Sequence, residues 1–297
     1  MRRRLLAACS AVVALGASAA ACSSTTDASS SGDDAPTTSG ASWTTTTVDA
    51  GGTSVSVQCM GSGAPTVWLV SDLGLTGAEG WGGTGVAEGL ADQVQVCTND
   101  RPGLGASGPA TSDRTVEQQA DDLAAVIEAS GASTPVVVVG QGAGTFIARM
   151  LAQRSLPLVA GMVLIDPVLW TSNAEPSADA SAGVVAELAG LDLVDADLGG
   201  YGSAALPPPP VPTVVLGASH TRPARSSAGD TGTTLTAADL SPSDDERHTR
   251  QEALANKSPF GSFLLVEDAG SSIQHWDPDA VIAAVESVLA SPNLKSS

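Results

Sequence analysis

Short apolar runs of strand length alternate with helix-patterned segments along most of this 297-residue chain. The clearest run is the four consecutive valines at 136–139, which end at Gly140 and predict a strand that is buried on both faces. Strands that alternate with helices are joined by crossovers and pair in parallel. The order therefore predicts an α/β fold with a doubly wound, mostly parallel sheet. A chain of this length, 42% hydrophobic, can bury one sizeable core.

The other elements are predicted from apolar periodicity and capping residues. Residues 54–58 alternate, which favours an early antiparallel strand, and further strands are expected at 66–70, 94–97, 161–165, 211–216 and 262–266. Helices are expected at 116–127, 145–154, 244–256 and 278–289, the first opened by a capping box at Thr115 and Gln118, the last capped by Asp277. Two further segments separate these strands and helices. One is expected to be a short lid at about 167–210, between the sixth and seventh strands, and the other is expected to be a loop at 217–240.

The first residues resemble an export signal rather than part of the fold. Three arginines at 2–4 precede a run of small and apolar residues that ends in three alanines and Cys22, so residues 1–21 are expected to be a signal peptide. The ending resembles a bacterial lipobox, in which the Cys is lipidated and becomes N-terminal; the alternative is cleavage without lipidation and secretion. Residues 22–42 are rich in Ser, Thr, Asp and Gly and are expected to form a disordered tether to a domain at 43–297.

The two cysteines that remain in the domain are Cys59 and Cys97, and both lie in strand-like runs. If these strands are neighbours, a disulfide is expected in an oxidising compartment. The alternative is a pair of buried thiols.

The charge excludes one class of partner. Lys and Arg number 13 against 32 Asp and Glu, which gives a formal charge of -19. Such an acidic chain repels phosphates, so nucleic acid is not expected as a partner. The three histidines show no metal-ligand spacing, and a short Gly103-x-Gly105 segment does not amount to a dinucleotide fingerprint, so neither a metal nor another cofactor is expected.

Five short motifs follow one another along the chain. They are Thr-Val-Trp-Leu-Val-Ser-Asp-Leu-Gly at 66–74, Asn-Asp-Arg-Pro-Gly-Leu-Gly-Ala-Ser at 99–107, Gly-Gln-Gly-Ala-Gly at 140–144, Leu-Ile-Asp-Pro at 164–167, and a loop and helix start at 269–281. In this order they resemble the α/β-hydrolase superfamily over residues 48–289. The resemblance implies a pocket and oxyanion loop at Ser71, Asp72 and Leu73, and a nucleophile turn flanked by Gln141 and Ala143.

The residues that carry the chemistry are missing at the matching positions. The nucleophile position is Gly142, which has no atom that can form a covalent intermediate, and the base position is Ser271, whose hydroxyl cannot accept the proton. Asp72 places a carboxylate where negative charge should be stabilised. Glycine at 142 relieves the strain expected from a positive φ at this turn. Asp166 occupies the alternative position for the acid, where an Asp also occurs for structural reasons.

These residues together predict a non-catalytic α/β-hydrolase-like envelope lipoprotein, a degenerate member of the superfamily. It is expected to lie on the outer face of the cell membrane through a lipid on Cys22 and to bind a small molecule or an envelope protein. The alternative is a serine-type ester or amide hydrolase with a relocated site, using Ser71, Asp72 or His275.

Overall fold

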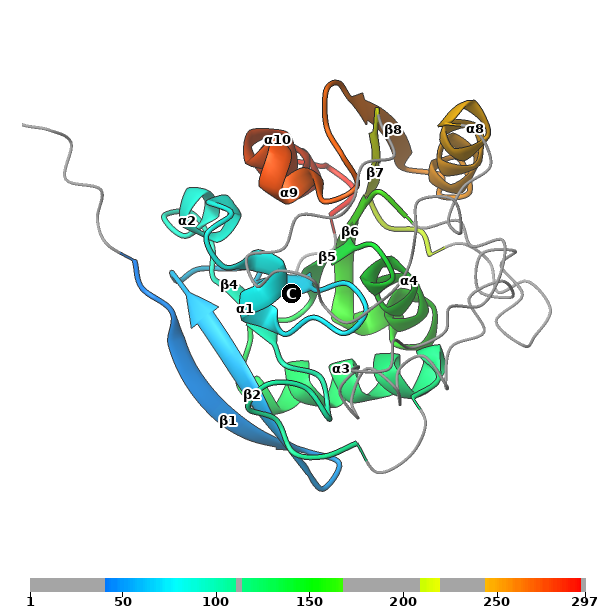
Figure 1. The fold of residues 1–297 in the computed structure, drawn as a ribbon. Coiled ribbons are helices and arrows are strands. Elements are labelled where there is room, and N and C mark those ends of the chain that lie inside the picture. The colour runs from blue at the N-terminus through cyan, green and yellow to red at the C-terminus, as the bar shows by residue number, and fades with distance from the viewer. Residues whose placement is uncertain (1–40, 111–113, 168–208, 220–243, 295–297) are drawn as a thin grey trace, which may run out of the picture. The chain divides into compact units, whose positions relative to one another are not determined.

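The computed structural model of the protein describes residues 41–110, 114–167, 209–219 and 244–294. Its strands form one sheet, with helices packed against it (Figure 1). Within these ranges the sheet has eight strands in the order β1-β2-β4-β3-β5-β6-β7-β8. The strands are β1 (Thr44–Ala50), β2 (Thr53–Met60), β3 (Val67–Val70), β4 (Val96–Asn99), β5 (Val136–Gln141), β6 (Val159–Ile165), β7 (Thr213–Ala218) and β8 (Gly261–Val266). β2 pairs antiparallel with β1 and β4, and the other pairs are parallel. The predicted mostly parallel α/β sheet is therefore confirmed.

Helices cover both faces of the sheet. They are α1 (Gly77–Trp81), α2 (Val86–Leu90), α3 (Val116–Ser130), α4 (Gly144–Arg154), α8 (Asp244–Ala255), α9 (Ile273–Trp276) and α10 (Pro278–Leu289), with a 3-10 turn at Leu156–Leu158. One core cluster joins side chains of α3, α4 and α8 to one face of the strands, and a second joins α1, α2, α9 and α10 to the other face. A sheet covered in this way buries its central strands on both sides, as the valines of β5 are.

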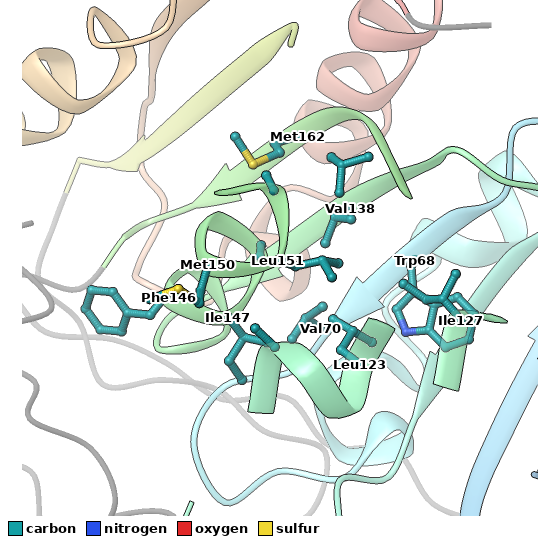
Figure 2. Close-up of a cluster of buried hydrophobic side chains, with 14 of the residues drawn as sticks. Trp68, Val70, Leu123, Ile127, Val138, Phe146, Ile147, Met150, Leu151 and Met162 are labelled. Atoms are coloured by element: carbon teal, nitrogen blue, oxygen red, sulfur yellow. The ribbon is translucent and has the colours of Figure 1, made fainter. Parts of the chain in front are cut away.

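The packing of α3 and α4 fixes the position of the turn that follows β5. Figure 2 shows Leu123 of α3 and Phe146, Ile147 and Leu151 of α4 in the cluster that also contains Val138 of β5. Two glycines let α4 approach the strands closely: a Cβ on Gly140 would meet the backbone of Gly144, and a Cβ on Gly144 would meet the carbonyl oxygens of Val70 and Ser71. The start of α4 is thus held against the ends of β3 and β5.

The two predicted helix caps are confirmed. Thr115 and Gln118 form the expected capping box at the start of α3, and the side chain of Asp277 accepts a hydrogen bond from the N–H of Ala280 at the start of α10. The sequence did not predict β1 or the short helices α1, α2 and α9. Strand β1 is mostly polar and exposed, and it pairs with β2 through a two-residue turn of Gly51 and Gly52, both with positive φ.

Several expectations fall on residues outside the described ranges. The signal peptide at 1–21, Cys22 and almost all of the tether lie within 1–40, and the compact unit that the structure describes begins at Ala41. Most of the lid expected at about 167–210 and of the loop expected at 217–240 also lies outside these ranges. Among the helices described, none is both long and apolar enough to cross a membrane.

The expected disulfide is present. Cys59 on β2 and Cys97 on β4 are register partners in neighbouring antiparallel strands, with their Cα atoms 4.1 Å apart, and their sulfur atoms are bonded. The bond ties the antiparallel edge of the sheet to its parallel centre.

Candidate functional site

The candidate site forms where β3 and β5 end side by side. Val70 at the end of β3 is the register partner of Gly140 near the end of β5. Because the strands are parallel, the residues that follow them emerge at the same edge of the sheet. The fold therefore brings Asp72 and Leu73 together with Gln141, Gly142 and Ala143, although the two segments lie 69 to 71 positions apart in the sequence.

The turn between β5 and α4 is sharp and is centred on Gly142. Its φ is +55°, so the positive φ expected at this position is confirmed. The N–H of Gly142 donates to the carbonyl oxygen of Ile165 on β6 at 3.1 Å, and its own carbonyl accepts from the hydroxyl of Thr145 at 2.7 Å. These bonds fix the turn so that the N–H of Ala143 points away from the helix and toward the end of β3, where its acceptor lies.

The carboxylate of Asp72 occupies the space in front of this turn. Its Oδ1 accepts one hydrogen bond from the N–H of Leu73 and a second from the N–H of Ala143, each at 2.7 Å. A Cβ built on Gly142 would overlap Cγ and both oxygens of this carboxyl group. The space that a side chain at position 142 would need is therefore already filled by the side chain of Asp72.

Two neighbours hold the backbone of Asp72 in place. The amide of Gln141 makes a reciprocal pair of contacts: its Oε1 accepts from the N–H of Asp72 at 3.2 Å, and its Nε2 donates to Oδ2 at 3.3 Å. The buried Arg101 donates to the carbonyl oxygens of Ser71 and Asp72 at 2.9 and 2.8 Å. Arg101 belongs to the motif at 99–107, and the loop that it braces is the one that carries Asp72.

Ser71 does not face the turn at Gly142. Its side chain is buried, and its hydroxyl donates to the carbonyl oxygen of Thr76 at 3.0 Å, inside its own loop. Gly80 of α1 packs so closely against it that a Cβ there would contact the Ser71 hydroxyl. Ser71 also lines a small cleft between the ends of β3 and β4 and the helices α3 and α4, beside Asn99 and Arg101.

Asp166 lies at the end of β6 in a separate buried network. Its φ is +40°, which is uncommon for a residue other than glycine. Oδ1 accepts from Nη1 of Arg247 at 2.6 Å, from Nε2 of Gln251 at 2.9 Å and from the N–H of Ala218 at 3.2 Å. The carboxylate thus joins α8 to β6 and β7. Arg247 and Gln251 were not predicted from the sequence; their spacing of four residues puts them on one helix face, but nothing in the sequence indicates which acid they contact.

The loop that was expected to carry a base follows β8. Ser271 is half-buried there, just before α9, and His275 lies on α9 itself. Within the described ranges no hydrogen bond joins Ser271 to the turn at Gly142. His248 is half-buried on α8, and its Nε2 lies 2.9 Å from the carbonyl oxygen of Ala218. No group of three or more His, Cys, Asp or Glu in the described part of the chain is arranged to hold a metal ion.

The comparisons with known proteins agree on the architecture. A family profile described as "alpha/beta hydrolase fold" matches residues 74–195. Among solved structures, a predicted CIB-like hydrolase from Thermoplasma acidophilum superposes with a TM-score of 0.59 at 14% identity, covering 84% of this chain and 99% of that one. A thermophilic esterase from Thermogutta terrifontis gives 0.58 at 19% identity, covering 84% and 98%. The chain has the α/β-hydrolase fold.

One similar curated protein is YqjL of Bacillus subtilis (strain 168). The two chains are 31% identical over 108 residues, which is 36% of this chain and 42% of YqjL. The match thus spans less than half of the length of that relative. Carboxylesterase CesB, also from Bacillus subtilis, is similar in fold, with a TM-score of 0.56 at 13% identity over 84% of this chain and 92% of that one.

In an α/β-hydrolase fold the strand-to-helix turn after β5 presents the nucleophile, and the oxyanion is bound by two backbone N–H groups. One belongs to the residue after the nucleophile and the other to the loop after β3. At the corresponding positions of this chain lie the N–H groups of Ala143 and Leu73, and both donate to Asp72. Asp72 was expected to repel negative charge near this site; the structure shows in addition that one of its own carboxyl oxygens accepts from both N–H groups.

Proposed function

We propose that this protein is a non-catalytic α/β-hydrolase-like protein that binds a small molecule or a protein partner. The observation that carries the proposal is the position of the Asp72 carboxylate, which overlaps the place of any side chain at 142 and accepts from Leu73 and Ala143. An acyl-transfer enzyme needs a nucleophile at this turn and free donors for the developing oxyanion. Gly142 supplies no nucleophile, and a carboxylate competes for both donors.

The base position supports the same proposal independently. Ser271 carries a hydroxyl whose pKa lies far above neutral pH, so it cannot take a proton from a nucleophile and return it to a leaving group. Asp166, at the alternative acid position, is paired with Arg247 and Gln251 and so serves as a contact between elements. The nucleophile position (Gly142), the base position (Ser271) and the N–H donors that Asp72 occupies thus all depart from what hydrolysis requires.

The proposed location is the outer face of the cell membrane. It rests on the N-terminal sequence, in which three arginines, an apolar run and three alanines precede Cys22. The Cys59–Cys97 disulfide supports export, because such bonds persist in oxidising compartments. Labelling cells with an alkyne fatty acid tests the anchor: the wild-type chain takes up the label, and Cys22→Ser does not.

The alternative is a hydrolase with a relocated site, and the local contacts oppose it. The hydroxyl of Ser71 is committed to the carbonyl oxygen of Thr76 and lies in a buried loop. A relocated serine would also need the oxyanion donors, which Asp72 occupies.

Labelling with a fluorophosphonate probe decides between the two functions. The purified full-length protein should remain unlabelled, and it should not hydrolyse p-nitrophenyl esters above the rate in buffer. A Ser71→Ala variant is the matched control, since it removes the one serine of the β3 loop. Stoichiometric labelling of the wild type that disappears in Ser71→Ala would establish the relocated hydrolase and end the non-catalytic proposal.

A further inference from the structure

The two N–H groups that meet Asp72 form a binding site built from separate parts of the fold. The N–H of Leu73 comes from the loop after β3, and that of Ala143 comes from the N-cap position of α4, an 11-residue helix. Both donate to one oxygen at 2.7 Å, which is the short distance typical of hydrogen bonds to a charged acceptor. The start of a helix also carries partial positive charge, which favours an anion there.

The occupant of this site is a carboxylate on a well-fixed backbone. Arg101 donates to the carbonyl oxygen of Asp72, and Gln141 accepts from its N–H. The backbone that carries the Asp72 side chain is therefore fixed by a hydrogen bond on each side. A group tethered in this way acts at a high effective concentration, and a free anion has to compete with it. Helix α4 has no side-chain cap of its own at Ala143, so Asp72 supplies one from another loop.

We infer that this centre is a carboxylate-binding site that the protein fills with its own side chain. This inference rests on the proposed loss of catalysis, because a working hydrolase needs the same donors vacant. The ligand class of the centre is a small carboxylate such as formate or acetate. It binds once the Asp72 side chain is removed, and one of its oxygens accepts from the N–H groups of Leu73 and Ala143. In the wild type, ligands of the protein bind outside this centre.

Formate binding to Asp72→Ala tests the inference. We expect the thermal midpoint of this variant to rise with formate and to saturate, because a ligand that binds only the folded state stabilises it by mass action. Sodium chloride at the same ionic strength should give no such rise. The affinity of the wild type for formate should be weaker by at least on the order of tenfold, since its site is full.

Two further variants make the result specific. Asp72→Asn keeps an oxygen that can accept both hydrogen bonds, so its site stays filled and it should bind formate no better than the wild type. Asp100→Ala is the matched control, because Asp100 also accepts two backbone N–H groups, from Gly77 and Ala106 at 3.0 and 2.9 Å, but lies away from the turn at Gly142. A folded Asp72→Ala that shows no saturable response to formate overturns the inference, as does a response of Asp72→Asn equal to that of Asp72→Ala.

Hydrogen exchange in the wild type provides a second test, which holds even if Asp72→Ala does not fold. The amides of Leu73 and Ala143 should exchange slowly, since both donate to a carboxylate, and exchange of both at the rate of unprotected amides would contradict the inference. These outcomes are separate from the proposed function. Ester turnover by the wild type would remove the proposed function, whereas absent formate binding would remove only the self-filled site. Unprotected amides would remove the self-filled site and the part of the proposed function that rests on Asp72, and would leave the part that rests on Gly142 and Ser271.

Discussion

The carboxyl group of Asp72 fills the volume that a Cβ atom on Gly142 would need. The two residues are therefore coupled: while Asp72 keeps its position, position 142 has to be glycine. The φ of +55° at Gly142 gives a second, independent reason for glycine there, because other residues are strained in this conformation. The two reasons can be separated by mutation.

Replacing Gly142 with Ala should destabilise the fold by more than backbone strain alone, which is on the order of 1–3 kcal/mol. The additional loss comes from displacing Asp72 and its hydrogen bonds. Gly131, with a φ of +74° and nothing within 4 Å of a Cβ, is the matched control for the strain. Urea unfolding should give a larger loss for Gly142→Ala than for Gly131→Ala. In a double-mutant cycle with Asp72→Gly, the two changes should be non-additive by on the order of 0.5–3 kcal/mol. Equal losses, or strict additivity, would show that the two side-chain positions are independent.

Restoring the two missing reactive groups should not restore a reactive serine. In Gly142→Ser with Ser271→His, the new side chain at 142 meets the Asp72 carboxyl group, and the oxyanion donors remain occupied. Adding Asp72→Gly removes both obstacles. We expect a fluorophosphonate probe to label the triple variant and to leave the double variant unlabelled, with circular dichroism as the check that both fold. Labelling of the double variant at position 142 would mean that Asp72 leaves the site readily.

The sequence predicted the central elements because their patterns are strong and local. The valines of β5 and the capping box of α3 depend on nearby residues only, and both are as expected. Strand β1 was not predicted because it lies at the edge of the sheet, where its run of threonines is polar and exposed and shows no apolar alternation. Its pairing with β2 is a tertiary contact that periodicity does not encode.

The candidate site was likewise predicted from the sequence only in part. The position of Gly142 and its positive φ follow from a motif of five residues between a strand and a helix, and motif order carries that information. The place of the Asp72 side chain does not follow, because it depends on how closely two loops approach after the sheet has formed. The resemblance predicted a carboxylate near the expected oxyanion donors, and the structure shows that this carboxylate accepts from the N–H groups of both Leu73 and Ala143.

The disulfide should contribute substantially to stability, because it closes a loop between residues 38 positions apart. In chain-entropy terms a loop of this length corresponds to about 4 kcal/mol. Urea unfolding of the wild type with and without dithiothreitol should show this difference. The variant with Ser at both Cys59 and Cys97 is the control and should not respond to the reductant. A wild type that is equally stable after reduction would mean that strand pairing alone holds this edge of the sheet.

The buried pair of Arg247 and Asp166 should be among the most sensitive contacts of the fold. Both side chains are 6% exposed, and Nη1 of Arg247 lies 2.6 Å from Oδ1 of Asp166. Replacing Arg247 with Ala leaves a buried carboxylate without its cation, which costs on the order of 3–5 kcal/mol. Arg154→Ala is the matched control. Its partner Asp121 raises the pKa of Arg154 through a hydrogen bond, but the pair is 42% and 52% exposed, so we expect a loss of about 0–1 kcal/mol.

Thermal and urea unfolding of the two variants give the comparison directly. Asp166→Asn provides the complementary test, since Asn tolerates a positive φ and removes the charge that Arg247 neutralises. In the double variant with Asn at 166 and Ala at 247, the loss should be smaller than for Arg247→Ala alone, because the uncompensated charge is gone. If the double variant is less stable than Arg247→Ala, the carboxylate of Asp166 stabilises the fold through its hydrogen bonds from Gln251 and from the N–H of Ala218 rather than through its pairing with Arg247.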